Sequence, residues 1–124
     1  MGVLDADRVR AALGVRLADR FLQYATRPQP GEPGHLLIRI DEHVAGARGD
    51  AALAARLAMA CRLLLLRADE AEVDARAAIV GAVRYFVDTY DLAPDDAPRG
   101  YDDDAKVVDY VIGAVAPDLA RVGG

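Results

Sequence analysis

Acidic side chains are concentrated in one stretch of this 124-residue chain, Tyr85 to Ala105, which reads YFVDTYDLAPDDAPRGYDDDA. Carboxylates at this density could hold a divalent cation, act as acid–base groups, or face a basic partner. Pro94, Pro98 and Gly100 punctuate the stretch, so it connects elements rather than continuing one. Its seven aspartates fall within seventeen residues: Asp88, Asp91, Asp95, Asp96, Asp102, Asp103 and Asp104.

A cation site in this stretch would use carboxylates from two helix ends. Mg²⁺ and Ca²⁺ prefer hard oxygen ligands, and the candidates are Asp91, Asp95, Asp103 and Asp104. The pattern is not an EF-hand, because it lacks the alternating D-x-D-x-D-G and the glutamate at the twelfth position. An acid–base pair would need one carboxyl with a raised pKa, and no histidine lies nearby to support it. We therefore expect no cofactor, with Mg²⁺ or Ca²⁺ as the alternative.

The same residues also suit a purely structural role. Pro94 fixes its own φ angle and Gly100 offers a positive φ. Asp102 or Asp103 can cap the following helix, and Asp104 in its first turn is favoured by the helix dipole. This interpretation makes the stretch a rigid connection between two helices.

Tyrosines lie in or beside the acidic stretch and suggest a contact surface. Tyr85, Tyr90, Tyr101 and Tyr110 have apolar rings with hydroxyls that can reach a partner. We expect a basic protein surface to contact Tyr90, Asp96, Tyr101 and Asp102. The alternative is that the tyrosines form a polar lid on the core.

The histidines and the cysteine point to no transition-metal site. His35 and His43 do not have a recognised ligand spacing, and two imidazoles fall short of a structural zinc site. Cys61 lies in the apolar run MACRLLLL, so we expect a small buried hydrophobe.

Composition and charge exclude several classes of function. The chain has no serine, which rules out a serine-nucleophile hydrolase. Residues 1–67 carry ten arginines and seven acids, whereas residues 68–124 carry five basic residues and thirteen acids. Arginines nowhere cluster densely enough for a nucleic-acid footprint, so we expect no nucleic acid. The start of the chain does not resemble a signal peptide, and no apolar run approaches the roughly 20 residues of a membrane span. We expect a cytoplasmic protein.

Hydrophobic periodicity predicts helices throughout. The first covers Asp5 to Tyr24, and a Pro/Gly-rich loop over residues 26–34 follows it. Further helices are predicted from His35 to Ala47, after an Asp50 cap to Arg67, and from an Asp69–Glu72 capping box to Tyr90. A last helix after the acidic stretch carries Val108, Val111, Ile112 and Val115 and ends before Pro117.

Two apolar stripes run along the predicted helix from Asp50 to Arg67. Leu53, Leu57, Cys61 and Leu64 form one; Met59, Leu63 and Leu66 form the other. A helix that is apolar on most of its circumference is either central in a bundle or packed on a second protomer. A homodimer is therefore compatible with the sequence.

The chain resembles the YkvA-like family of bacterial proteins, also called DUF1232. The residues that carry the resemblance run from Val80 to Val115, with DLAPD at Asp91–Asp95 and GYDDD at Gly100–Asp104. Two positions depart from the pattern: Thr89, where the family tends to have proline, and Asp96, where it tends to have an apolar residue. The resemblance implies a small helical domain whose molecular function is not established.

We therefore predict a single all-α domain over residues 1–124, a compact bundle of about five helices with the acidic loop between the last two long ones. Its expected function is a non-catalytic interaction or regulatory module that presents the acidic, tyrosine-lined loop to a protein partner. The alternative is a divalent-metal-binding protein or metal-dependent enzyme that uses the loop aspartates.

Overall fold

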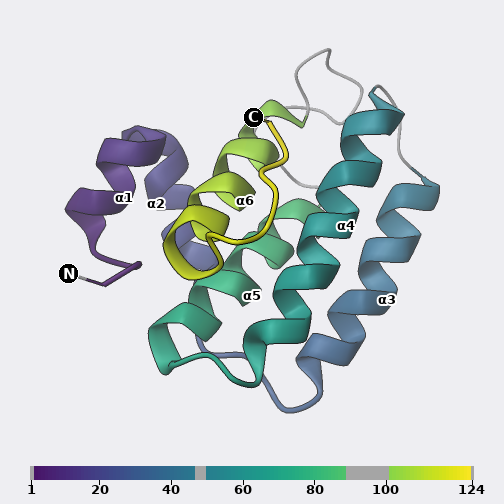
Figure 1. Ribbon diagram of the computed structural model, residues 1–124, viewed down its shortest axis with the longest axis horizontal. Coiled ribbons are helices and arrows are strands. Elements are labelled where there is room, and N and C mark those ends of the chain that lie inside the picture. Colours follow the sequence, from purple (N-terminus) through teal and green to yellow (C-terminus); the bar gives the residue numbers. More distant parts are fainter. Residues whose placement is uncertain (1, 47–49, 89–100, 124) are drawn as a thin grey trace.

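The computed structural model describes residues 2–46, 50–88 and 101–123, which form six α-helices and no strand (Figure 1). The all-α prediction is confirmed, with six helices where about five were expected. The helices are α1 (Ala6–Leu13), α2 (Val15–Tyr24), α3 (Glu32–Ala45), α4 (Ala51–Ala68), α5 (Val73–Val87) and α6 (Asp102–Val115). None of the helices in these ranges has both the length and the apolar content needed to cross a bilayer.

The additional helix comes from a break at Gly14, where a single helix was predicted from Asp5 to Tyr24. Gly14 has φ 81° and ψ 163° and lies between α1 and α2. Residues with a side chain rarely adopt such a backbone conformation, so the glycine permits the chain to turn here. The break allows α1 to pack against both α2 and α6. The apolar residues Val9, Leu17 and Phe21 are buried on either side of it.

Helix α3 begins inside the segment predicted to be a loop. Its first residue is Glu32, and Gly31 before it has a left-handed φ of 79°. Pro33 fits the first helical turn because that turn makes no use of its backbone N–H. The prolines of residues 26–34 therefore do not prevent a helix from starting within this segment. Leu36 and Ile40 are buried on the inner face of α3.

Helix α5 is the centre of the bundle and packs against α2, α3, α4 and α6. Every residue from Ala77 to Val87 except Arg84 is buried. Small side chains allow this close packing, most clearly at Gly81. A Cβ at Gly81 would lie 2.7 Å from the Cα of Ala25, which follows α2. The sequence left the Asp50–Arg67 helix either central in a bundle or packed on a second protomer; in the structure, α5 is the central helix.

Helix α4 begins as predicted and buries only one of its two apolar stripes. The Asp50 side chain accepts a hydrogen bond from the Leu53 backbone N–H at 3.0 Å. Leu57, Cys61 and Leu64 are fully buried. The second stripe is exposed: Met59 is 55%, Leu63 37% and Leu66 72% exposed.

Two predicted helix caps are wrong. Asp69 ends α4 instead of beginning the next helix, and the residue before α5 is Glu72, whose side chain makes no capping hydrogen bond. Val73, the first residue of α5, is 63% exposed at the rim of the bundle. Tyr101 precedes α6, so Asp102 and Asp103 lie in the first helical turn and do not cap it.

Arg84 is the one residue between Ala77 and Val87 that is not buried, and its contacts fix the loop before α3. Its guanidinium donates to both carboxylate oxygens of Glu32, at 2.8 and 2.5 Å. It also donates to the backbone carbonyls of Tyr24, Thr26 and Arg27. One side chain thereby connects α5 to the end of α2 and the start of α3.

The segment after α6, residues 116–123, folds back along the bundle and is held at two points. Asp118 accepts two hydrogen bonds from Arg67 of α4, at 2.6 and 2.5 Å. Asp109 of α6 accepts from the backbone N–H groups of Val122 and Gly123, at 2.6 and 2.9 Å. Val122 is buried as a result. We call residues 116–123 the C-terminal tail.

Candidate functional site

Four helix ends meet at the end of the bundle that carries Tyr101–Asp104, a described part of the acidic stretch. They are the C-terminal ends of α3 and α5 and the N-terminal ends of α4 and α6 (Figure 1). Helix N-termini favour negative charge, and three aspartates occupy the first turn of α6. We call this region the acidic end. Tyr90, Asp91, Asp95 and Asp96 were predicted as site residues and lie outside the described residues.

Tyr101, predicted to contact a partner, lies in the core with only 4% of its surface exposed. Its ring packs near two others: the centroids of Phe86 and His43 are 6.4 and 6.2 Å away. His43 and Phe86 in turn form a T-shaped pair at 4.8 Å. This aromatic group connects α3, α5 and the start of α6. It holds the first turn of α6 against the bundle.

Asp104 is a buried charged residue of the acidic end, only 2% exposed. Its carboxylate lies close enough to Cys61 of α4 to help raise the pKa of that thiol, although burial of the thiol is the larger cause. Cys61 is buried as predicted and kept in its neutral form. Asp104 therefore faces the bundle rather than solvent.

Asp102 and Asp103 face away from the core. Asp102 is exposed and Asp103 half-buried. Asp103 lines a groove of about 530 Å³ together with Gly14, Leu17 and Lys106. Successive residues on a helix point about 100° apart, so the three aspartates have three different surroundings. Asp102 is the one that a large partner could reach most directly.

The predicted cation ligands are thus placed only in part. Asp103 lines the groove beside the α1–α2 break, while Asp104 faces Cys61. In residues 2–46, 50–88 and 101–123, no three His, Cys, Asp or Glu side chains form a group that could hold a metal ion. Asp91 and Asp95 belong to residues 89–100, so the four-aspartate site stays a prediction.

The other tyrosines have structural surroundings. Tyr85 is buried and packs edge-on against Tyr24, with ring centroids 5.8 Å apart. The Tyr110 hydroxyl donates to the Val3 backbone carbonyl at 2.5 Å, and its ring packs against Phe21. Partial burial raises the pKa of Tyr110. Tyr85, Tyr101 and Tyr110 therefore resemble the polar lid that was the alternative to a contact surface.

Besides the groove beside Asp103, sequence reasoning missed two further concave surfaces, because each is formed by segments far apart in the chain. A groove of about 400 Å³ runs between α1 and α6 and has Arg8, Lys106 and Arg121 on its walls. A smaller groove of about 200 Å³ lies between α4 and the C-terminal tail and is mainly apolar. The exposed stripe on α4 was the only signal for the second groove, since nothing in the sequence says where the tail lies.

Comparison with known proteins adds no relative: no family model, no curated protein and no solved structure matches this chain. The resemblance to the YkvA-like family accordingly stays a prediction based on the residues from Val80 to Val115.

Proposed function

We propose that this protein is a non-catalytic interaction module that binds a basic protein surface through its acidic end. The observation that carries the proposal is the different burial of neighbouring residues at the start of α6. Tyr101 and Asp104 are buried and fix the turn, while Asp102 is exposed. A carboxylate held by a rigid helix loses little freedom on binding, which favours affinity.

The charge distribution supports the same proposal. Residues 68–124 carry eighteen charged residues, of which thirteen are acidic. A surface with such an excess of one sign speeds association with a partner of the opposite sign, and this effect weakens as salt rises. Among the predicted contact residues, Asp102 is exposed and Tyr101 is not. We therefore assign the contact to carboxylates, and the buried Tyr101 holds the first turn of α6 in place.

A titration with a fluorescent arginine-rich peptide tests the proposal. Asp102→Asn/Asp103→Asn should weaken binding several-fold, and the loss should shrink at high salt because screening reduces charge interactions. The matched control is Asp7→Asn/Asp74→Asn, which removes two exposed first-turn aspartates from α1 and α5 and gives the same net charge. Equal weakening by both double variants would mean that net charge alone, not the acidic end, attracts the peptide.

A further inference from the structure

The groove between α1 and α6, which lie side by side (Figure 1), brings together cationic side chains from three distant parts of the chain. Its volume is about 400 Å³, within the range of roughly 300–1,000 Å³ that is typical of sites for small molecules. Arg8 enters it from α1, Lys106 from α6 and Arg121 from the C-terminal tail. The other lining residues include a single carboxylate: Ala12, Leu13, Asp109, Tyr110, Gly113 and Ala114.

Two of these cations, Arg8 and Arg121, lie on the same face of α6. The guanidinium carbon of Arg8 is 5.9 Å from the centre of the Tyr110 ring. The Arg121 guanidinium lies against Gly113, where a Cβ would come within 3.1 Å of one of its terminal nitrogens. Residues three apart on a helix are neighbours on its surface. Tyr110 and Gly113 therefore bring the two guanidiniums to the same part of the groove.

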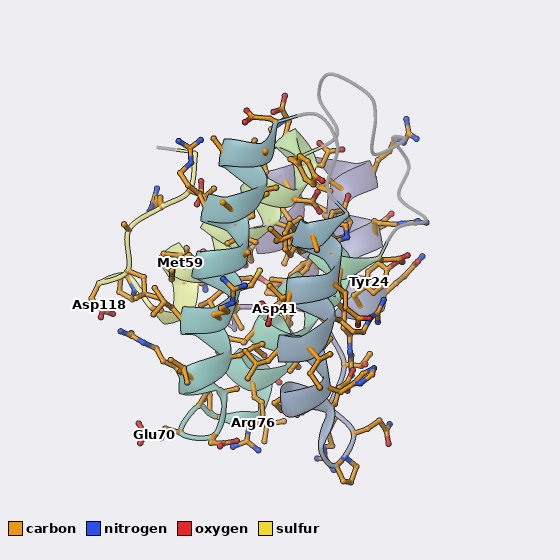
Figure 2. All side chains as sticks on the ribbon, turned by 90° about the vertical axis from the view of Figure 1, so that its right-hand side faces the viewer. Tyr24, Asp41, Met59, Glu70, Arg76 and Asp118 are labelled. Atoms are coloured by element: carbon orange, nitrogen blue, oxygen red, sulfur yellow. The ribbon has the colours of Figure 1, made fainter. Side chains whose placement is uncertain are left out.

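The C-terminal tail holds the backbone of Arg121 in place. Asp109 accepts hydrogen bonds from the N–H groups of residues 122–123, which directly follow Arg121. Arg67 of α4 binds the tail at Asp118, and Figure 2 shows this segment alongside α4. One wall of the groove is thus fixed before a ligand arrives, which lowers the entropy lost on binding.

The two arginines have no ion-pair partner in the part of the chain that the structure describes. Neither Arg8 nor Arg121 pairs with a carboxylate of residues 2–46, 50–88 or 101–123. The one carboxylate of the groove, Asp109, accepts hydrogen bonds from the tail with both of its oxygens. Lys106, three residues before it on α6, is its neighbour on the helix surface and offsets its charge.

Other carboxylates affect this part of the groove less. Asp5 acts on Tyr110 but does not line the groove. Burial is the main cause that raises the pKa of Tyr110; Arg8 lowers it, and Asp5 raises it by less than Arg8 lowers it. Asp103 is seven residues from Tyr110, about 10 Å along α6, which exceeds the screening length of about 8 Å at physiological salt. The two guanidiniums therefore dominate the local charge.

We propose that Arg8 and Arg121 bind the phosphate group of a small phosphorylated molecule in this groove. A guanidinium can donate two parallel hydrogen bonds to phosphate oxygens. A phosphate monoester carries a charge of about −1.5 to −2 at neutral pH, which matches two guanidiniums better than a single carboxylate does. The rest of the ligand would lie over the apolar side chains of Ala12, Leu13 and Ala114. This site goes beyond the proposed function and does not depend on it.

Phenyl phosphate is the probe, because it joins a phosphate monoester to one apolar ring. Titrated into the isotope-labelled full chain, it should cause saturable shifts of the Gly113 and Ala114 amide signals in NMR spectra. Benzoate offers the same ring with a single carboxylate charge and should bind several-fold more weakly. Arg8→Gln/Arg121→Gln should weaken the binding of phenyl phosphate by roughly tenfold or more, because charge-assisted hydrogen bonds are lost.

Arg27→Gln/Arg56→Gln is the matched control and has the same net charge as the double variant of the groove. Both side chains are exposed, lie outside this groove and form no ion pair with any described residue. This variant should bind phenyl phosphate as tightly as the wild type. Arg121→Gln alone keeps Arg8 on the Tyr110 ring, so α1 should stay packed, and it should weaken binding several-fold.

The acidic-end variant separates this site from the proposed function. Asp102→Asn/Asp103→Asn should weaken the arginine-rich peptide but not phenyl phosphate, whereas Arg8→Gln/Arg121→Gln should weaken only phenyl phosphate. Each proposal can therefore fail without the other.

The proposal is overturned if phenyl phosphate shows no saturable binding, or if benzoate binds equally well. Equal weakening by the Arg27→Gln/Arg56→Gln control would mean that net charge alone attracts the anion. Sedimentation with phosphatidic acid vesicles that depends on Arg8 and Arg121, without binding of phenyl phosphate, would assign the site to a lipid surface instead.

Discussion

At the scale of single residues, the contact between α2 and α5 depends on the missing side chain of Gly81. A Cβ there would come within 2.7 Å of the Ala25 Cα and 2.9 Å of its Cβ. Backbone atoms cannot move aside as the end of a flexible side chain can. The glycine therefore stabilises the packing at a cost in helix propensity of about 1 kcal/mol relative to alanine.

Gly81→Ala should destabilise the protein by about 1–2 kcal/mol, because overpacking outweighs the gain in helix propensity. Urea unfolding followed by circular dichroism measures the change. Gly113→Ala on α6 is the control. Its Cβ would meet only the end of the Arg121 side chain, at 3.1 Å, so it should be neutral or stabilising. Equal stabilisation by both substitutions would contradict the close packing described for Gly81.

At the scale of elements, the Arg84–Glu32 pair connects the first residue of α3 to the central helix α5. Its side chains are 15% and 18% exposed, and Arg84 also donates to backbone carbonyls of the preceding loop. The hydrogen bonds from Arg84 are the main cause that lowers the pKa of Glu32 below its usual 4.5, against the opposing effect of partial burial. The pair thus links α3 to the central helix.

Arg84→Met should cost about 3 kcal/mol, the lower end for a buried ion pair because both side chains keep some exposure. Arg10→Met removes one partner of the pair with Asp19, whose side chains are 45% and 50% exposed, and should cost less than about 1 kcal/mol. Chemical denaturation at neutral pH measures both. Similar losses would show that the Arg84 contacts add little beyond a surface pair.

The stability that Glu32 contributes should depend on pH in a defined direction. Its pKa is lower in the folded than in the unfolded chain, so its contribution is present above the usual value of 4.5 and disappears as pH falls through the folded pKa. The difference in unfolding free energy between wild type and Glu32→Gln should therefore shrink below pH 4.5. A difference that stays constant down to low pH would contradict the lowered pKa.

The sequence predicts the type of the elements better than their ends. Apolar spacing identified the helical character of every helix, and Asp50 was identified as a cap because its effect is local. The break at Gly14 was missed because Leu13 and Leu17 keep the helical spacing across it. The start at Glu32 was missed because a distant residue, Arg84, stabilises it.

At the scale of the whole molecule, the site was less predictable than the fold. The sequence indicated the acidic end and the second stripe of α4, both visible as local patterns. Burial of Tyr101 and Asp104 depends on α3, α4 and α5 packing around them. The grooves depend on the path of the tail, which Asp109 and Arg67 fix through long-range contacts.

Cations should not stabilise the protein if its acidic end is a protein-binding surface. We expect the same Tm in EDTA and in excess Mg²⁺ or Ca²⁺, measured by thermal unfolding at constant ionic strength. A cation held at 100 times its Kd would add about 2.7 kcal/mol. A rise of that kind, selective for one cation and absent in Asp103→Asn, would instead support the alternative metal site of Asp91, Asp95, Asp103 and Asp104.

The most direct test of the proposed interaction module is photo-crosslinking in the native cells, with a photoreactive amino acid replacing Asp102 or, as control, Asp7. Both positions are exposed in the first turn of a helix. Position 102 should give a discrete adduct, identified by mass spectrometry as a protein crosslinked through a basic surface, and high salt before irradiation should reduce it. Position 7 should not give that adduct. The same adducts from both positions, or none from position 102, would contradict binding through the acidic end.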